Sequence, residues 1–181
     1  EYWPKAAEYV ARNALLFPAT YELPGVFQAA PLAGVVNGVL WTLRLEFTFY
    51  VVLLLIRARL PLVLALCAIC AGVWLAVALA RPDWADERAT RIALLGGRNG
   101  FLFFAGAALQ LAKVRVPPWA GVVGAVAAAA PLAGPLALPV AVVGLARPGK
   151  LPADLSYGVY IYAFPVQQML AVYGQLNLVT A

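Results

Sequence analysis

Long apolar segments that alternate with short stretches containing Lys and Arg constrain the fold of this chain more than any other feature. Hydrophobic residues make up 64% of its 181 residues, and Asp, Glu, Lys and Arg together only 12%. A soluble domain has roughly 45–50% apolar and about 25% charged residues. A core of this size cannot enclose such an apolar surplus, because a short chain has much surface for its volume. The sequence therefore predicts an all-α integral membrane protein.

The apolar runs predict a polytopic bundle with about six transmembrane helices. A helix needs about 20 mostly apolar residues to cross the hydrocarbon core of a bilayer. The expected spans lie near residues 33–56, 60–80, 92–112, 119–133, 135–146 and 155–173. Gly96–Gly97 and Gly134–Pro135 are interpreted as turns. Because the fourth and fifth runs are short, a single broken hairpin over residues 119–146 is the alternative.

Residues 1–32 are expected to form an extracytoplasmic segment, and residues 33–181 the transmembrane core. Lys5, Glu8 and Arg12 recur at the spacing of one helical face, which favours a short amphipathic helix on the membrane surface. Three prolines in the second half of the segment predict a loop. The chain starts at Glu1 without a signal-peptide pattern, so we expect an excerpt from a longer polypeptide.

The placement of Lys and Arg indicates how the bundle is oriented. With six spans, three loops on one side carry the pairs Arg57/Arg59, Lys113/Arg115 and Arg147/Lys150. Short loops rich in basic residues stay in the cytoplasm, although the Arg residues of the opposite loop, 81–99, count against this orientation. Basic residues that fall between apolar runs favour contact with membrane lipids, and binding to nucleic acid is not expected.

Two residue types limit the chemistry of the chain. It contains no His, so it provides neither an imidazole base nor an imidazole metal ligand, and no metal site is predicted. Cys67 and Cys70 form a C-x-x-C pattern inside an apolar run. No basic neighbour activates either thiol, so we interpret both as packing residues rather than a redox pair.

Arg44 and Glu46 lie in the middle of the first expected span, in the stretch "NGVLWTLRLEFTFY". A charged residue at the centre of a span costs about 2.5–3.5 kcal/mol on insertion scales. The two side chains point about 200° apart around a helix and cannot pair with each other. Either both pair with charges on other helices and hold the bundle together, or at least Glu46 lines a polar cavity for reaction or transport.

The same stretch resembles the signature of the membrane-bound acyltransferase 3 family, which O-acylates bacterial sugars. The residues that match are Asn37, Gly38, Leu40, Trp41, Thr42, Leu43, Glu46 and Tyr50. Two later stretches, "FLFFAGAALQL" (101–111) and "DLSYGVYIYAFPVQQ" (154–168), resemble further motifs of that family. Three motifs in the same order and at matching separations cover most of the chain.

The resemblance implies an O-acyltransferase of the bacterial cytoplasmic (inner) membrane. Such an enzyme moves an acyl group, typically acetyl, from cytoplasmic acyl-CoA to a hydroxyl of an extracytoplasmic or lipid-linked glycan of the cell envelope. Acyl-CoA would be the cosubstrate, and no bound cofactor is expected. Glu46 would orient the catalytic His or act as the general base. The candidate substrate-binding residues are Asn37, Trp41, Arg44, Arg98, Asn99, Ser156, Tyr157 and Tyr160.

Simpler interpretations stand beside these roles. Trp41 could anchor its helix at the membrane interface, and the Tyr residues of the last span could be a packing face. Arg98 and Asn99 could belong to a solvated turn. Gln167 and Gln168 lie deep in an apolar run and need hydrogen-bond partners.

The chain departs from the family in two respects. The position of Arg44 often holds Pro or Ser in the family, so the resemblance assigns Arg44 no role. The family has about ten spans, with its presumed catalytic His in the first, whereas this chain contains no His. We therefore expect that the N-terminal helices and the last helix are missing and that these residues are inactive alone. A polytopic transporter or flippase of a sugar-linked substrate, without acyl chemistry, is the alternative function.

Overall fold

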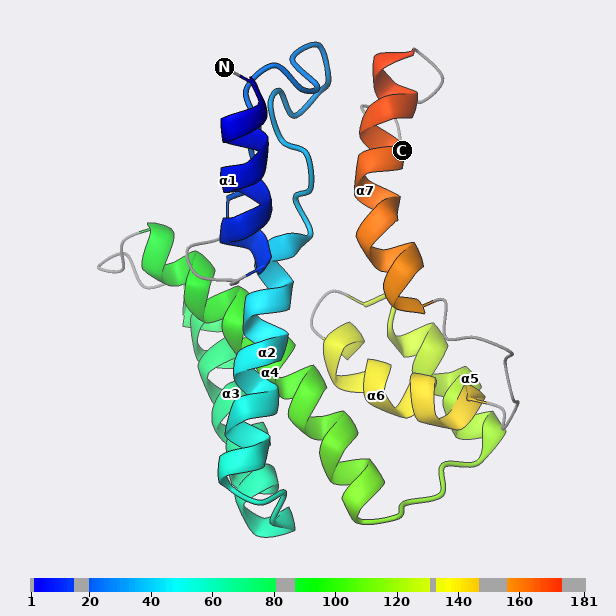
Figure 1. Cartoon of the computed structure of the whole chain (residues 1–181). Coiled ribbons are helices and arrows are strands. Elements are labelled where there is room, and N and C mark those ends of the chain that lie inside the picture. The colour runs from blue at the N-terminus through cyan, green and yellow to red at the C-terminus, as the bar shows by residue number, and fades with distance from the viewer. Residues whose placement is uncertain (1, 15–19, 81–86, 131–132, 147–155, 174–181) are drawn as a thin grey trace. The chain divides into compact units, whose positions relative to one another are not determined.

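The computed structural model describes residues 2–14, 20–80, 87–130, 133–146 and 156–173 (Figure 1). Within these residues the fold is all-helical, with seven helices, no strand and one isolated bridge between Glu22 and Val35. The helices are α1 (Tyr2–Ala14), α2 (Leu40–Leu55), α3 (Leu60–Ala80), α4 (Glu87–Leu111), α5 (Pro118–Ala127), α6 (Ala133–Leu145) and α7 (Ser156–Val172). The chain forms two compact units: Glu1–Arg44 with Lys150–Ala181, and Leu45–Gly149.

Helices α3 and α4 of the second unit pack against each other through glycines. A Cβ atom added to Gly97 would lie 3.0 Å from both the Cys70 carbonyl oxygen and the Trp74 nitrogen. One turn later, Gly100 faces the Cys70 sulfur. The buried core farther along consists of Val63, Phe104 and Ala108. Later residues of α4 thus meet earlier residues of α3, so the two helices are antiparallel.

The predicted turn at Gly96–Gly97 is wrong, because α4 runs through both residues without a break. The missing side chain of Gly97 allows α4 to lie directly on the α3 backbone. Glycine serves tight turns and close helix contacts equally well, so its position in the sequence does not distinguish the two. The third expected span, 92–112, therefore belongs to a helix that already begins at Glu87.

Helix α2 begins at Leu40, whereas the sequence predicts the first span from residue 33. Residues 33–39 form turns instead, and Gly34 takes a φ of +77°, which side chains other than glycine rarely adopt. Farther along α2, the Phe49 ring packs 5.4 Å, centroid to centroid, from both Phe103 and Phe104 of α4. The part of α2 that belongs to the second unit is held by this aromatic contact.

Helices α5 and α6 are short and pack antiparallel through backbone contacts. A Cβ atom on Gly121 would lie 2.7 Å from the Gly144 carbonyl carbon, and one on Gly124 would lie 2.9 Å from the Ala141 nitrogen. The 10 and 13 residues of these helices extend about 15 and 20 Å, less than the roughly 30 Å of a bilayer core. The structure therefore favours the broken hairpin over two spans. Gly134–Pro135, predicted as its turn, already lies in α6.

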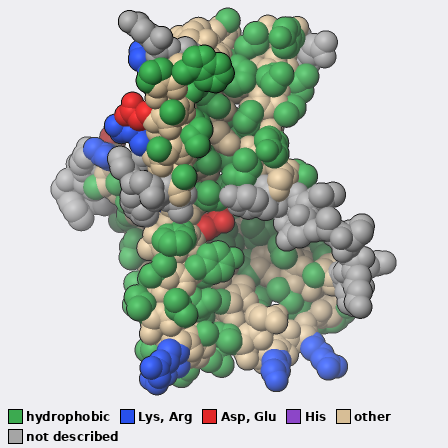
Figure 2. All heavy atoms as spheres, viewed as in Figure 1, with side chains coloured by type: hydrophobic (Ala, Val, Ile, Leu, Met, Phe, Trp, Pro, Cys, Tyr) green, Lys and Arg blue, Asp and Glu red, His purple; other side chains and the backbone are tan. Residues whose placement is uncertain are grey.

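Basic residues gather at one end of the α3–α4 pair. Arg57 and Lys113 follow α2 and α4 with φ values of 53° and 52°, the left-handed conformation that Gly usually takes at helix ends. Because α3 and α4 are antiparallel, Arg57 and Arg59 before α3 lie at the same end as Lys113 and Arg115 after α4. Lys and Arg side chains accordingly line the lower edge of Figure 2. The third expected basic pair, at positions 147 and 150, lies outside the described residues.

Helices α3 and α4, with 21 and 25 residues, are long and apolar enough to cross a membrane. Among the described helices two meet this criterion, against the predicted six spans. Only 11% of the most apolar stretch of α3 is buried, whereas a core helix of a soluble protein would be mostly buried. Hydrophobic side chains cover much of the visible face in Figure 2, and those exposed on α3 include Leu62, Leu64, Ile69, Val73 and Leu79. This exposed apolar surface fits contact with lipid.

Gly144→Ala should destabilise the second unit, whereas Gly106→Ala should not. A Cβ atom at position 144 would lie 2.6 Å from the Gly121 Cα atom, and nothing lies within 4 Å of one at position 106. Forcing the α5 and α6 backbones apart should cost about 1–3 kcal/mol. The unfolding temperature of the purified protein in detergent, followed with a thiol-reactive dye at Cys67 and Cys70, measures the difference. Equal unfolding temperatures for the two variants would contradict the α5–α6 contact.

Candidate functional site

Asn37, directly ahead of α2, is only 6% exposed and uses both ends of its side-chain amide. Its Oδ1 atom accepts a hydrogen bond from the Val39 N–H at 3.1 Å, forming a turn that leads into α2. Its Nδ2 atom donates to the carbonyl oxygen of Ile161 in α7 at 2.9 Å. Asn37 therefore joins two segments that lie 124 residues apart in the sequence.

The Ile161 carbonyl needs this donor because of Pro165. In an α-helix a carbonyl accepts a hydrogen bond from the N–H four residues later, and proline has no N–H to donate. Pro165 lies inside α7, four residues after Ile161. An unpaired backbone carbonyl is costly in apolar surroundings. Asn37 supplies the hydrogen bond that the helix itself cannot make.

Two hydroxyl groups extend the polar contact along α2. Tyr160 of α7 and Thr42 of α2 hydrogen-bond each other through their hydroxyls. The Val39 carbonyl oxygen lies 3.0 Å from the Thr42 hydroxyl and 3.3 Å from that of Tyr160. Each hydroxyl carries one proton, so one donates to the carbonyl and the other to its partner hydroxyl. The first turn of α2 is thereby tied to α7.

Gln168 holds the non-helical segment ahead of α2. The residue is 2% exposed, and its Nε2 atom donates to the carbonyl oxygens of Leu32 at 2.8 Å and Val35 at 3.1 Å. The prediction that Gln168 needs partners in an apolar run is confirmed. Gln167, for which the same was predicted, is exposed instead. We call Asn37, Thr42, Tyr160 and Gln168 the Asn37 cluster.

The Asn37 cluster positions segments rather than presenting free groups to a ligand. Asn37 and Tyr160, both predicted to bind substrate, spend their polar atoms on contacts within the chain. Sequence reasoning missed Thr42 and the Ile161 carbonyl as members of this site. Proline inside an apolar run was the available signal, because it always leaves the carbonyl four residues earlier without its helical donor.

The other predicted residues of the first unit lie on the same two helices. Trp41 and Arg44 are half-buried in the first turns of α2. Ser156 and Tyr157 are the first two residues of α7. Of the predicted residues in the first unit, the structure brings Asn37 and Tyr160 together, both at the first turn of α2.

The described residues leave Glu46 exposed, and the predicted polar cavity around it stays a prediction. Glu46 is exposed, and the following aromatic residues Phe47 and Tyr50 are 51% and 61% exposed. Phe49, about one turn after Glu46, is among the α2 residues that pack on the core around α4. A carboxylate at this place in an apolar helix needs polar surroundings from another source.

Arg98 and Asn99 lie inside α4 and not in a turn, and both line the same hollow in the second unit. This Arg98 hollow has a volume of about 390 Å³ and lies among α4, the residues that follow α5, and α6. Asn99 is half-buried, and Arg98 is exposed at its mouth. The sequence pairs these two residues as a candidate substrate contact, and the fold gives them a shared cavity.

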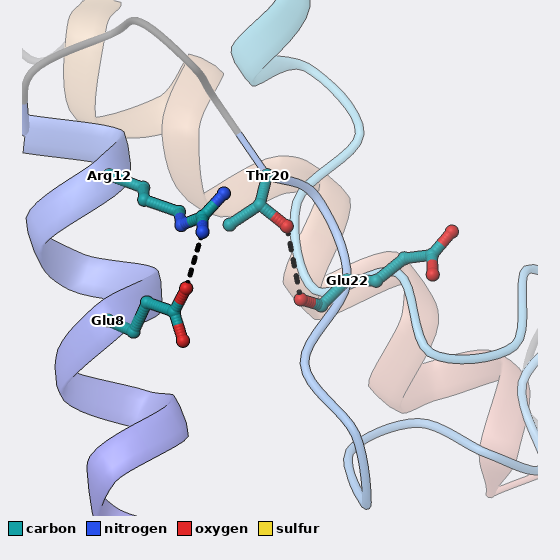
Figure 3. A network of polar contacts seen from close by, with 4 residues as sticks. All are labelled: Glu8, Arg12, Thr20 and Glu22. Atoms are coloured by element: carbon teal, nitrogen blue, oxygen red, sulfur yellow. Dashed lines mark hydrogen bonds and ion pairs between the residues drawn. The ribbon is translucent and has the colours of Figure 1, made fainter.

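A second hollow, of about 380 Å³, lies in the first unit between α1 and the loop that follows it. Glu8 and Arg12 form an ion pair of 2.6 Å beside it, and the Thr20 hydroxyl donates to the Glu22 carbonyl at 3.5 Å (Figure 3). Burial raises the pKa of the Tyr9 phenol above its ordinary value of 10.0, so this side chain stays neutral. The hollow offers hydrogen-bonding groups but contains none of the predicted site residues.

Within the described residues no group of three or more Cys, Asp or Glu side chains could hold a metal ion. No protein-family model, curated protein or solved structure matches this chain.

Asn37→Leu should destabilise the protein by about 1–3 kcal/mol, because it leaves the Ile161 carbonyl without a donor. The loss should shrink in a Pro165→Ala background, where residue 165 regains the N–H that can donate to that carbonyl. Unfolding measurements in detergent on the parent protein, both single variants and the double variant give the coupling energy, expected at about 0.5–3 kcal/mol.

The matched control for this cycle is Gln167→Leu, which removes an exposed amide from α7 and should change stability by less than about 0.5 kcal/mol. Strictly additive effects of Asn37→Leu and Pro165→Ala would show that Asn37 does not compensate for the proline.

Proposed function

We propose that this chain forms the helical core of a membrane-bound O-acyltransferase of the acyltransferase 3 kind. It transfers an acyl group from acyl-CoA on the cytoplasmic side to a hydroxyl of a glycan or lipid-linked sugar on the other side. The hydroxyl oxygen bonds to the acyl carbon, the thioester C–S bond breaks, and the hydroxyl proton ends on the thiol of coenzyme A. The protein is then a multi-pass protein of the bacterial cytoplasmic membrane.

The observation that carries this proposal is the Asn37 cluster. Its members come from the two stretches, 37–50 and 154–168, whose resemblance to the family is most detailed. The third stretch, 101–111, contributes Phe103 and Phe104 to the packing around Phe49 of the first stretch. Within its own unit, each of the two later stretches thus contacts part of the first stretch, and these contacts support the proposal.

Glu46 is the proposed catalytic carboxylate. It lies one turn after Thr42 on the same face of α2, so the hydrogen bonds of Thr42 help fix the helix that carries it. A carboxylate that accepts an imidazole N–H holds the ring in the tautomer that can take up the hydroxyl proton. Because these 181 residues contain no His, the imidazole in this proposal belongs to a further helix. The exposed position of Glu46 leaves it accessible to such a helix.

The basic end of the α3–α4 pair supports the proposed orientation. Arg57, Arg59, Lys113 and Arg115 lie in short connections of the kind that stay in the cytoplasm. Their positive charges suit the phosphate groups of an approaching acyl-CoA.

Glu46→Gln should lower glycan O-acylation by about 10²–10⁴-fold while protein abundance stays unchanged, because the amide keeps the shape but cannot orient an imidazolium. Mass spectrometry of envelope glycans from cells that express the complete gene measures the acyl content. Glu87→Gln, at the exposed start of α4, removes the other described carboxylate of the second unit and should leave acylation intact.

Unchanged acylation in the Glu46→Gln variant would remove Glu46 from the mechanism. If instead less glycan reached the cell surface, with the acyl content of each sugar unchanged, the result would favour a transporter or flippase.

A further inference from the structure

The Arg98 hollow has the dimensions of a ligand site. Its volume of about 390 Å³ lies in the range of roughly 300–1,000 Å³ that small-ligand pockets occupy. Arg98 and Asn99 line it from α4, Pro135 and Leu138 from α6, and residues 128–130 from the end of α5. Polar groups therefore gather on one wall, and the others are apolar.

Arg98 has no ion pair or hydrogen bond with any other residue that the structure describes. The described carboxylates of the second unit are Glu46 and Glu87, and neither lines the hollow. Glu87 lies on the same helix, about 16 Å from Arg98 along the axis. A guanidinium on an apolar helix is stable only with an anionic or aqueous partner. Arg98 is exposed at this hollow, so its guanidinium is open to an anion that enters from outside the chain.

The place of Arg98 along α4 indicates what kind of anion this is. The polar part of α4 ends at Arg91, and Arg98 lies two turns, about 10 Å, farther along. A long Arg side chain can reach back from such a depth toward the headgroup layer of a bilayer. Leu102 and Leu138 border the hollow, and Leu138 is 39% exposed. An anion with an attached hydrocarbon chain matches both the charge and this apolar wall.

The helix ends around the hollow contribute little net charge, so the positive charge of the hollow comes from Arg98. The end of α5 carries a partial negative charge and the start of α6 a partial positive one, and the two roughly offset each other. The Gly134 N–H of α6 is already bonded to the Ala130 carbonyl at 2.7 Å. Asn99, half-buried in the wall, offers an amide donor beside the guanidinium. A guanidinium and an amide donor together suit a phosphate group.

We infer that the Arg98 hollow binds the phosphate group of a membrane lipid, with Arg98 as counter-charge, Asn99 as hydrogen-bond donor and the lipid chain against Leu102 and Leu138. Two sources share this chemistry: a phospholipid of the bilayer, and a polyprenyl phosphate of the kind that carries sugars. The second source would make the hollow the acceptor site of the proposed acyltransferase, and only this refinement rests on the proposed function.

Lipid pairs that differ only in their phosphate test the inference. The unfolding temperature of the purified protein in detergent is measured with dioleoyl phosphatidic acid against dioleoylglycerol, with a polyprenyl phosphate against its polyprenol, and with inorganic phosphate alone. A phosphate lipid at about a hundred times its dissociation constant should raise the unfolding temperature by roughly 5–10 °C. The neutral partner and inorganic phosphate should not, and the more effective phosphate lipid identifies the source.

Three variants assign the effect to the hollow. Arg98→Gln should abolish the rise yet leave the unfolding temperature without lipid unchanged, because Arg98 makes no ion pair or hydrogen bond with a described residue. Arg98→Lys keeps the charge but not the paired N–H groups, so part of the rise should remain. Arg88→Gln removes the same charge from an exposed position of α4 outside the hollow and should respond like the parent protein.

Equal rises in the parent protein and in Arg98→Gln would overturn the inference, as would an equal rise with inorganic phosphate alone. No acyl transfer is measured in this experiment. A negative result therefore leaves the proposed function standing, and inactivity of the Glu46→Gln variant has no bearing on lipid binding.

Discussion

The hydrogen bond from Asn37 to the Ile161 carbonyl is the contact on which the first unit depends. Backbone groups in apolar surroundings need partners from within the protein, and Pro165 deprives α7 of one. Gln168 meets the same requirement for the non-helical segment before α2, whose carbonyls have no helical donors. A helix that contains a proline and an irregular segment thus stabilise each other, which explains how turns can precede α2 where a continuous span would be the simpler solution.

The helices of the second unit pack through glycines, whose lack of a side chain lets the backbones approach, rather than through polar contacts. Gly97 lets α4 approach the α3 backbone, and Gly121 and Gly144 let α5 and α6 touch. Between helices that are exposed to lipid, apolar side chains gain little from association, because the lipid is equally apolar. Close backbone contact then supplies the van der Waals energy that holds helices together. Gly106, with open space around it, lies outside these contacts.

The polar groups of the Asn37 cluster are paired within the chain, whereas Glu46 and Arg98 of the second unit are exposed. Paired groups position helices, and exposed charges are open to binding. Asn37 and Tyr160 have partners within the chain, so they fix the geometry of α2 and α7. Glu46 is exposed, and Arg98 lines a hollow without a described partner. Our two proposals place further groups at these open charges, an imidazole at Glu46 and a lipid phosphate at Arg98.

Sequence alone determined the helical class, the residues of α3 and the need of Gln168 for partners, because hydropathy and polarity are local properties of the chain. It did not determine that Gly96–Gly97 continue a helix, because glycine serves turns and helix contacts alike. It also did not determine that α2 starts at Leu40. Only the tertiary structure decided that Asn37 serves a carbonyl 124 residues away and that Arg98 and Asn99 share a hollow. These outcomes depend on which surfaces meet, and no short stretch of sequence carries that information.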